Sequence, residues 1–364
     1  MNDLRCHIAL GVDLTPGPIT LIGDNGVGKT SVIEAIGYLA SGASHRVATD
    51  APLIRTGCDR AVVEGHVSAA GAVNRLAIEI MPGRSNRARL NGGPVRPREL
   101  IGRLRTVLFS PEDCALITGE PGGRRRFLDD LLRQHRPRQA AVQAEYERTV
   151  RQRSALLKQC AQGRGSHLAE ELAIWDEALI QRGSDLTVQR WRCAADLGPL
   201  VDQAYAELAD DTSVQLTYVS AALGEHADAG DHAEVASGLR NALNRLRAAE
   251  IARGSCLVGP HRDDLRVDLG GLPARGHASQ GEVWSLSLAL RLGARQLLAE
   301  IDDGRGEPVL LCDDVFSALD NRRRTRVSDI LLTAEQVIVT GASADDVPAA
   351  LRGSIRRLDP GAQS

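Results

Sequence analysis

The chain has 364 residues, a length that suits two lobes or domains rather than one ordinary hydrophobic core. Hydrophobic residues make up 43% and charged residues 25%, close to the averages of soluble globular proteins, so the composition excludes disordered and fibrous classes. No apolar run approaches the roughly 18 to 20 residues of a membrane-spanning helix, and no apolar segment follows the start as in a secretory signal. We therefore expect a cytoplasmic protein that makes no membrane contact.

The spacing of the cysteines and the scarcity of lysine limit which kinds of site the chain can contain. The seven cysteines are widely spaced and include no Cys-x-x-Cys pair, which favours buried thiols in a reducing compartment over zinc or redox chemistry. The formal net charge is −3, and of the 44 basic residues only Lys29 and Lys158 are lysines. A lysine inside a motif is therefore informative in this chain.

The N-terminal part is predicted to form an α/β lobe with an antiparallel flap. A short apolar strand at residues 19–23 precedes a helix at 28–40. Strands at 62–68 and 73–81 are expected to pair across a short turn. The Asn91-Gly92 dipeptide predicts a hairpin within residues 87–95, because both residues tolerate the positive φ of a type I′ turn.

Helical periodicity dominates the middle of the chain, from Arg124 to about Ala252. A glycine-containing break at residues 162–166, with Ser166 as the cap of the following helix, predicts two antiparallel helices, each about 35 Å long. The heptads are too few for a long coiled coil. We expect a helical lobe with its own core.

The C-terminal part returns to alternating strands and helices. Strands are expected at 309–312, at 337–340 and near Ile355, with a helix at 321–332. Such alternation builds a parallel sheet, so the two ends of the chain are expected to form one lobe. The predicted division is 1–110 with 300–364 as the first lobe and 111–299 as the mostly helical second lobe.

The sharpest motif begins at Gly23 and satisfies Gly-x4-Gly-Lys-Ser/Thr in full, between a predicted strand and a predicted helix. Backbone N–H groups of such a loop and the helix N-terminus bind phosphate. Lys29 is expected to reach the β- and γ-phosphates, and the Thr30 hydroxyl to bind Mg²⁺. The predicted ATP-binding residues are Gly23, Asp24, Asn25, Gly26, Val27, Gly28, Lys29, Thr30 and Ser31.

Two adjacent carboxylates end the apolar strand predicted at 309–312. Asp313 is expected to hold Mg²⁺ directly or through water, and Asp314 to orient the attacking water as a catalytic residue, together with Lys29. This pair would complete the nucleotide site.

Ser279-Gln280-Gly281-Glu282 opens an amphipathic helix shortly before these acids. The segment resembles the signature motif of ABC-type ATPases, in which serine and the helix N-terminus bind the γ-phosphate held by a second subunit. A plain capping box, with Ser279 as the cap and Glu282 three residues on, explains the same residues. The two interpretations are compatible, since a capped helix N-terminus is itself an anion site. Residues 316–320 resemble the D-loop of the same class.

Together these segments resemble the RecF family of SMC-like ATPases. The resemblance spans residues 10–345 and rests on segments 23–30, 34–39, 109–113, 124–129, 259–264, 279–282 and 311–320. It implies an ABC-type ATPase head of two lobes, without the long coiled coil of SMC proteins. It also implies ATP-dependent dimerisation on DNA, with Ser279, Gln280 and Gly281 contacting ATP in trans and slow hydrolysis releasing the dimer. The implied partners are DNA, RecO and RecR, in support of RecA loading at single-strand gaps.

Candidate DNA contacts come from an arginine-rich stretch. Seven arginines stand between residues 84 and 105 against one acid, Glu99, and those we single out are Arg84, Arg87, Arg89, Arg96 and Arg98. An ordinary solvated flap explains them equally well, because this chain uses arginine everywhere. Residues 124–126 are a second candidate. Aromatic residues make up only 3%, which favours contact with a duplex backbone over base stacking.

Two alternative functions share the main motifs. The nucleotide-binding subunit of a transporter would need a membrane partner and a switch histidine after the strand at 337–340, where the sequence has Thr340-Gly341-Ala342 and no histidine. Thr340 is a candidate for the γ-phosphate sensor instead. A non-hydrolysing ATP-gated module is the second alternative, because Asp314 is one methylene shorter than the glutamate typical of the class.

Overall fold

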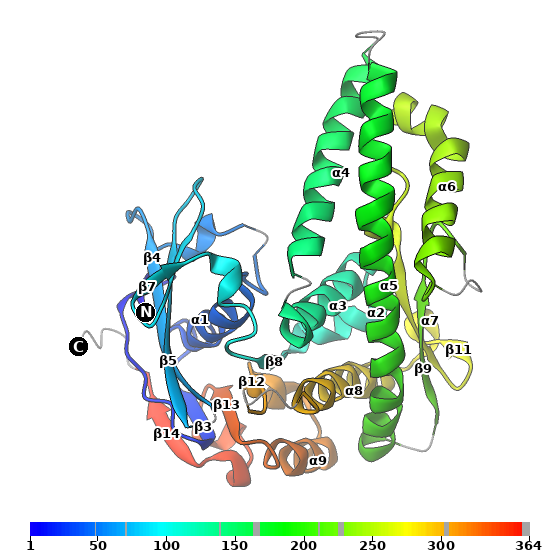
Figure 1. Ribbon diagram of the computed structural model, residues 1–364. Coiled ribbons are helices and arrows are strands. Elements are labelled where there is room, and N and C mark those ends of the chain that lie inside the picture. The colour runs from blue at the N-terminus through cyan, green and yellow to red at the C-terminus, as the bar shows by residue number, and fades with distance from the viewer. Residues whose placement is uncertain are drawn as a thin grey trace. The chain divides into compact units, whose positions relative to one another are not determined.

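The computed structural model describes residues 1–47, 49–69, 71–137, 140–162, 168–209, 212–224, 229–301 and 306–358 (Figure 1). The chain divides into two compact units. Unit 1 comprises Met1–Cys114, Glu207–Asp210 and Trp284–Ser364, and unit 2 comprises Ala115–Ala206 and Asp211–Val283. Both ends of the chain thus fold together. Residues 111–114, 207–210 and 284–299 belong to unit 1, although the sequence-based division assigns them to the second lobe.

A five-stranded parallel sheet forms the base of unit 1. Its order is β14-β3-β13-β12-β8, from β3 (Gly17–Ile22), β8 (Thr106–Phe109), β12 (Val309–Cys312), β13 (Gln336–Gly341) and β14 (Ser354–Arg357). The predicted strands at both ends of the chain are confirmed, and β8 is an addition. Ile19, Leu21 and Ile338 are fully buried, as expected for a sheet covered on both faces. Helices α1 (Lys29–Ser41) and α9 (Asn321–Leu331) follow β3 and β12.

The second sheet of unit 1 is the antiparallel flap. Its order is β2-β1-β4-β5-β6-β7, from β1 (Asn2–Leu4), β2 (His7–Ala9), β4 (Ala61–Ala69), β5 (Ala72–Ile80), β6 (Arg87–Leu90) and β7 (Gly93–Val95). Asn91 and Gly92 have φ of 51° and 84°, which confirms the predicted hairpin turn between β6 and β7. The predicted pairing of β4 with β5 is also confirmed.

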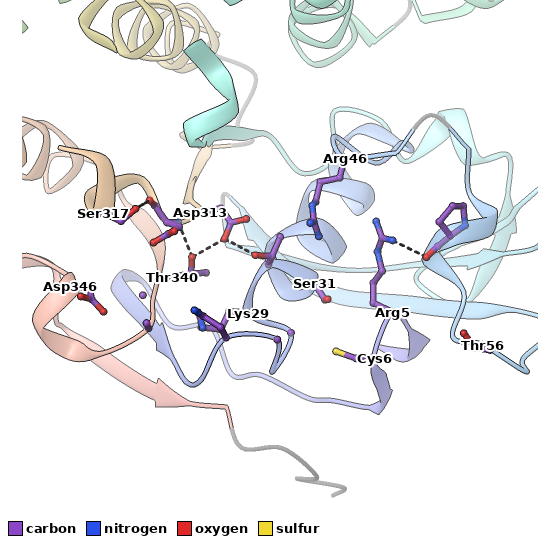
Figure 2. A pocket seen from close by; sticks show the side chains of 18 of the residues that line it. Arg5, Cys6, Lys29, Ser31, Arg46, Thr56, Asp313, Ser317, Thr340 and Asp346 are labelled. Atoms are coloured by element: carbon purple, nitrogen blue, oxygen red, sulfur yellow. Dashed lines mark hydrogen bonds between the residues drawn. The ribbon is translucent and has the colours of Figure 1, made fainter. Parts of the chain in front are cut away.

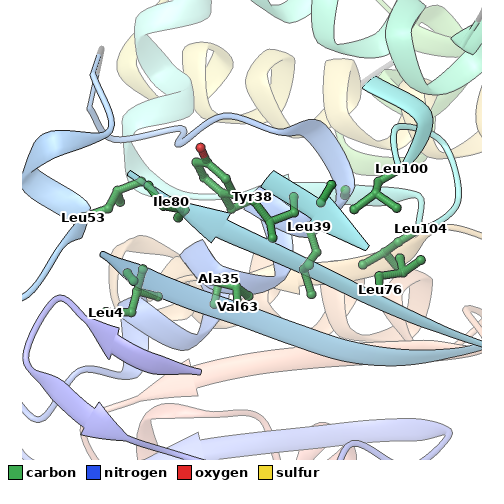
Figure 3. Close-up of a cluster of buried hydrophobic side chains, with 14 residues drawn as sticks. Leu4, Ala35, Tyr38, Leu39, Leu53, Val63, Leu76, Ile80, Leu100 and Leu104 are labelled. Carbon is green, nitrogen blue, oxygen red and sulfur yellow. The ribbon is translucent and has the colours of Figure 1, made fainter. Parts of the chain in front are cut away.

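A hydrophobic cluster joins the flap to α1. Figure 3 shows Tyr38 and Leu39 of α1 among buried side chains that include Leu76 and Ile80 of β5. Alternate residues of β5 face this cluster, which is the period-2 pattern of a sheet with one buried face. The flap is therefore packed against the same helix that begins at Lys29.

Unit 2 is built on long helices and one small sheet. Its helices are α2 (Ala115–Thr118), α3 (Pro121–His135), α4 (Ala140–Ala161), α5 (Leu168–Leu208), α6 (His232–Arg253) and α7 (Ala274–His277). The last two residues of α5 belong to unit 1, and α8 (Gln280–Ala299) starts in unit 2 and ends in unit 1. Helices α4 and α5 lie side by side (Figure 1), and the predicted break with its cap Ser166 lies outside the described residues.

The mostly helical pattern predicted for residues 124–252 misses one strand. β9 (Val214–Val219) pairs antiparallel with β10 (Asp264–Leu269), and β11 (Leu272–Pro273) completes a sheet of order β11-β10-β9. The β-branched residues and Tyr218 suit a strand, and a partner strand distant in sequence was needed to reveal it. The short 3₁₀ helices of the described residues are Ala51–Leu53, Pro97–Glu99, Pro111–Cys114, Pro260–Arg262, Val315–Ala318, Ala344–Asp346 and Ala349–Leu351.

Buried arginines hold unit 2 together. Arg153 is fully buried and pairs with Asp176 and Glu250, so three long helices meet at one guanidinium. Arg124 is only 5% exposed and makes two hydrogen bonds to the Asp264 carboxylate at 2.8 and 2.9 Å. Of the second DNA candidate, residues 124–126, Arg124 is therefore used inside the fold, Arg125 donates to the Asp263 carbonyl at 2.7 Å, and Arg126 is exposed.

Within the described residues, no helix has the length and apolar character needed to span a membrane.

Candidate functional site

The phosphate-binding loop follows β3 directly and ends where α1 begins. Gly26 and Gly28 adopt φ of 87° and 98°, which L side chains rarely adopt, and Lys29 is the first residue of α1. The loop's glycines are therefore required by the backbone, and the first N–H groups of α1 point out of the helix end. The predicted strand, loop and helix arrangement is confirmed.

Lys29 lies over its own loop. Its Nζ donates hydrogen bonds to the carbonyl oxygens of Gly23 at 2.6 Å and Asp24 at 3.0 Å. An ammonium has three N–H donors, so one donor remains after these two contacts. Gly23 and Asp24 therefore shape the loop and hold the lysine, although neither is among the residues that line the pocket.

The first acid of the pair, Asp313, lies at the centre of a polar cluster. Its Oδ1 accepts hydrogen bonds from Thr30 Oγ1 at 3.0 Å and from Thr340 Oγ1 at 2.8 Å (Figure 2). Residues from the ends of β12 and β13 thus meet the first turn of α1, because the carboxyl ends of parallel strands lie at one edge of the sheet. The sequence-based pairing of Thr30 with Asp313 agrees with this contact.

The second acid, Asp314, has a strained backbone. Its φ of 52° and ψ of 27° place it in the left-handed region, a conformation that costs a non-glycine residue about 1–2 kcal/mol. Its N–H donates to Thr340 Oγ1 at 3.0 Å, and its carbonyl accepts from Ser317 Oγ at 2.8 Å. The Asp314 carboxylate is exposed. The turn thus presents this carboxylate to the pocket edge.

These groups line one cavity of about 750 Å³, all of it in unit 1 (Figure 2). The predicted residues in its wall are Asn25, Gly26, Gly28, Lys29, Thr30, Ser31, Asp313 and Asp314. The wall also contains residues that no sequence motif indicates, above all Arg5, Cys6, Arg46 and Ser317. The two arginines could not be singled out, because arginine supplies almost all the basic residues of this chain.

Ser279 begins α8 in a capping box. Its N–H donates to Glu282 Oε2 at 2.7 Å, and the Glu282 N–H donates to Ser279 Oγ at 3.3 Å. The capping-box interpretation is therefore confirmed, and it leaves the helix N-terminus exposed at Ser279 and Gln280. Ser279, Gln280 and Gly281 belong to unit 2 and are not among the pocket residues of the single chain.

The candidate DNA-binding arginines lie on the flap and the turns that follow it. All five, Arg84, Arg87, Arg89, Arg96 and Arg98, are exposed. Arg105, which we counted in the same stretch, is only 3% exposed and donates to the Leu298 carbonyl at 3.5 Å. That residue supports the fold of unit 1 and does not belong to a surface patch.

Similar proteins show which family the chain belongs to. The family model described as "RecF/RecN/SMC N terminal domain" matches residues 8–353. Relatives named "DNA replication and repair protein RecF" are 48% identical in Kineococcus radiotolerans (96% of this chain, 93% of the relative) and 46% identical in Streptomyces avermitilis (97% and 95%). The chain belongs to the RecF family.

Solved structures agree with the RecF assignment. A structure titled "Structure of the recombination mediator protein RecF-ATPrS in RecFOR pathway" matches with a TM-score of 0.88 and 25% identity, covering 99% of this chain and 95% of that one. The corresponding RecF-ATP structure matches with a TM-score of 0.86 and 26% identity, covering 95% and 91%. An Smc head domain derived from Pyrococcus furiosus, 15% identical with a TM-score of 0.50 and coverage of 96% and 89%, shares only the fold. The chain therefore has the ABC-type ATPase head fold of RecF.

Gly28→Ala is expected to damage the predicted phosphate-binding loop. A Cβ at this position would lie 2.1 Å from His7 Nε2 and 2.7 Å from Cys6 Sγ, at a φ of 98°. We expect nucleotide affinity to fall at least about tenfold and the free energy of unfolding to fall by about 1–3 kcal/mol. Nucleotide titration and urea unfolding measure the two effects.

Gly37→Ala is the matched control on α1, where a Cβ meets nothing within 4 Å. It should leave nucleotide affinity unchanged and stabilise the helix by up to about 1 kcal/mol. Equal nucleotide affinity in Gly28→Ala and wild type would contradict the loop geometry described above.

Proposed function

We propose that this chain is an ATP-dependent DNA-binding clamp of recombinational repair and replication restart, and that slow ATP hydrolysis releases the clamp. The observation that carries the proposal is the contact of Thr30 with Asp313, which joins the phosphate-binding loop to the acidic strand end in one pocket. The family assignment supports the same role, because the curated relatives are named DNA replication and repair proteins.

Thr30 and Asp313 suit a Mg²⁺ ion that accompanies ATP. Both offer hard oxygen ligands, and their oxygens lie 3.0 Å apart. Among the described residues, no cluster of three or more His, Cys, Asp or Glu side chains could hold a metal alone, so phosphate oxygens and water would supply the remaining ligands. When bound, Mg²⁺ neutralises charge on the β- and γ-phosphates during transfer.

The chain's own residues divide the remaining work. Lys29 and the N-terminus of α1 bind the phosphates, and the two hydrogen bonds from Lys29 to the loop keep its ammonium in place. The exposed carboxylate of Asp314 orients the attacking water. Thr340 fixes both acids, since its hydroxyl donates to Asp313 and accepts from the Asp314 N–H. Thr340 therefore has a structural role at this position, and it is also our candidate for the γ-phosphate sensor.

The second half of each site would come from a partner molecule. The exposed N-terminus of α8, with Ser279, Gln280 and Gly281, is a favourable anion site. The capping box does not use the N–H groups of Gln280 and Gly281, and the helix dipole is positive at this end. A two-fold dimer would bring this end onto the partner's ATP and create two equivalent composite sites. ATP binding and dimerisation would then be one equilibrium.

DNA would bind the clamp through its backbone. The exposed arginines Arg84, Arg87, Arg89, Arg96 and Arg98 supply the charge that phosphate contacts need. The similar solved structures are titled as members of the RecFOR pathway, which supports RecO- and RecR-type mediators as partners at gap junctions. All seven cysteines are free thiols, in keeping with a cytoplasmic site of action.

Two measurements test the proposal: gel filtration with ATP, ADP or no nucleotide, and a phosphate-release assay, each with and without duplex DNA. We expect a dimer that forms only with ATP and an ATPase rate that rises with DNA. A transporter subunit would show no response to DNA. A non-hydrolysing module would dimerise with ATP but show no turnover above background.

A mixture of two inactive variants tests the shared site. Ser279→Arg should bind ATP as a monomer but fail to dimerise, because a bulky group occupies the position of the partner's γ-phosphate. Mixed with Lys29→Met, it can form a heterodimer with one intact site, built from Lys29 of one chain and Ser279 of the other. Partial recovery of ATPase activity is expected. No recovery at any ratio, with both variants folded and able to associate, would leave Ser279 as a helix cap only.

A further inference from the structure

A buried carboxylate lies directly behind the wall of the nucleotide pocket. Glu34 is on α1, one turn after Thr30, and is 1% exposed. Its two oxygens accept hydrogen bonds from Arg5 Nη2 and Arg5 Nε, both at 2.7 Å, and Oε1 also accepts from Ser44 Oγ. Glu34 itself does not line the pocket, whereas Arg5 does.

The same carboxylate reaches the second arginine of the wall through a loop. Ser44 Oγ accepts hydrogen bonds from the N–H groups of Arg46 at 3.0 Å and Val47 at 3.2 Å while it donates to Glu34. The loop that carries Arg46 is therefore fastened to α1 at Ser44. Figure 2 shows Arg5 and Arg46 on the same side of the pocket.

Arg5 is held from several directions. Its guanidinium donates to the Pro52 carbonyl at 2.8 Å as well as to Glu34, and its backbone N–H donates to Leu53 at 2.7 Å. Its fork geometry is thus fixed by a bidentate carboxylate, the arrangement that positions arginine best. Glu34 thus contacts Arg5 directly and the loop of Arg46 through Ser44, so one carboxylate positions both cations.

Glu34 is held as an anion by its partners. Burial alone would raise its pKa, but the hydrogen bonds from Arg5 and Ser44 and the charge of Arg5 outweigh burial and hold the pKa below its ordinary value. Because Arg5 and Ser44 engage both of its oxygens, the carboxylate is not available as a general base. Its geometry suits positioning.

We propose that Glu34 is a positioning residue of the ATP site, which orders the cationic wall formed by Arg5 directly and by Arg46 through Ser44. The inference rests on the proposed function, because it assumes that ATP phosphates occupy the pocket. It assigns the helix that begins at Lys29 a second task, since α1 both binds phosphate at its first turn and fixes the opposite wall one turn later.

Glu34→Gln separates these contacts. The amide oxygen can replace Oε1 and still accept from Arg5 Nη2 and Ser44, but the amide N–H group would face Arg5 Nε, which is also a donor. We expect ATP affinity to fall about tenfold, with the KM raised and kcat nearly unchanged, because Lys29, Asp313 and Asp314 stay in place. Titration with a fluorescent ATP analogue and steady-state kinetics measure these values.

Glu64→Gln is the matched control. Glu64 makes the same bidentate ion pair, with Arg75 at 2.8 and 2.9 Å, but on the exposed flap outside the nucleotide pocket. It should leave ATP affinity unchanged. If Glu34→Gln proves too unstable for titration, Ser44→Ala tests the other arm, because it frees only the Arg46 loop and should weaken ATP binding about threefold.

Double variants show whether Glu34 acts through the arginines. In an Arg5→Ala background, Glu34→Gln should change ATP affinity less than about twofold, and Ser44→Ala should likewise add little to Arg46→Ala. Three results would overturn the inference: wild-type ATP affinity in both Glu34→Gln and Ser44→Ala, an equal loss of affinity in Glu64→Gln, or full additivity in the double variants. In each of these cases, ATP binding by the wild type would still uphold the proposed function. If the wild type binds no ATP, or Lys29→Met binds it equally well, both fail.

Discussion

Lys29→Met is expected to abolish ATP binding and, with it, dimerisation and ATP-dependent DNA binding. The substitution keeps a flexible apolar stem but removes the ammonium that donates to Gly23 and Asp24 and would bind the phosphates. Without this cation, the negative charge of the β- and γ-phosphates is left uncompensated in the loop, so affinity for ATP should fall by at least about 100-fold. Isothermal titration with ATP measures the loss.

Two further substitutions calibrate this result. Lys29→Arg should still bind nucleotide but hydrolyse it poorly, because the planar guanidinium cannot reproduce a compact charge inside the loop. Lys158→Met removes the chain's other lysine, which is exposed on α4 in unit 2, and should leave ATP binding and ATPase activity unchanged. Full ATPase activity in Lys29→Met would refute the assignment of the phosphate-binding loop.

Asp314→Asn is expected to bind ATP normally and to accumulate as a closed dimer that hydrolyses ATP about 100-fold more slowly or worse. Asparagine tolerates the left-handed backbone that Asp314 adopts, so the turn should survive while the charge that orients water is lost. Gel filtration with ATP would show a persistent dimer, and phosphate release would show the slow rate.

Asp313→Asn provides the contrast to that variant. It weakens the oxygen that accepts from Thr30 and Thr340, so metal-dependent ATP binding should suffer together with hydrolysis. Asp345→Asn changes an exposed carboxylate of the same unit, paired with Arg352, and should have no effect on either property. Normal hydrolysis in Asp314→Asn would mean that the roles of the two acids are assigned wrongly.

Local chemistry made part of this protein predictable. The glycine-rich loop, the Asn91-Gly92 hairpin and the Ser279 capping box each depend on residues close in sequence, and the structure confirms all three. The parallel sheet was predictable because alternation of strands and helices at both ends of a chain has few packing solutions.

What could not be predicted depends on contacts distant in sequence. β9 (Val214–Val219) has β-branched residues, but it is short and its partner β10 lies about 45 residues further along the chain, so the helical pattern around it outweighed this signal. Arg5 lines the pocket, whereas Arg105 and Arg124 are buried in the fold. In a chain whose positive charge is nearly all arginine, residue type says little about which guanidinium reaches a ligand, a buried carboxylate or the surface.

The sheet order has a consequence for synthesis of the protein. β3, which leads into the phosphate-binding loop, lies between β13 and β14, and the Thr20 hydroxyl bonds to the Leu351 carbonyl 331 residues away. During synthesis, the phosphate-binding loop and β3 therefore leave the ribosome long before β13 and β14, the strands between which β3 lies. β3 has neither of its neighbouring strands until β13 and β14 emerge, so a product that stops short of β13 should fail to bind ATP and would expose the unpaired edges of β3 to aggregation.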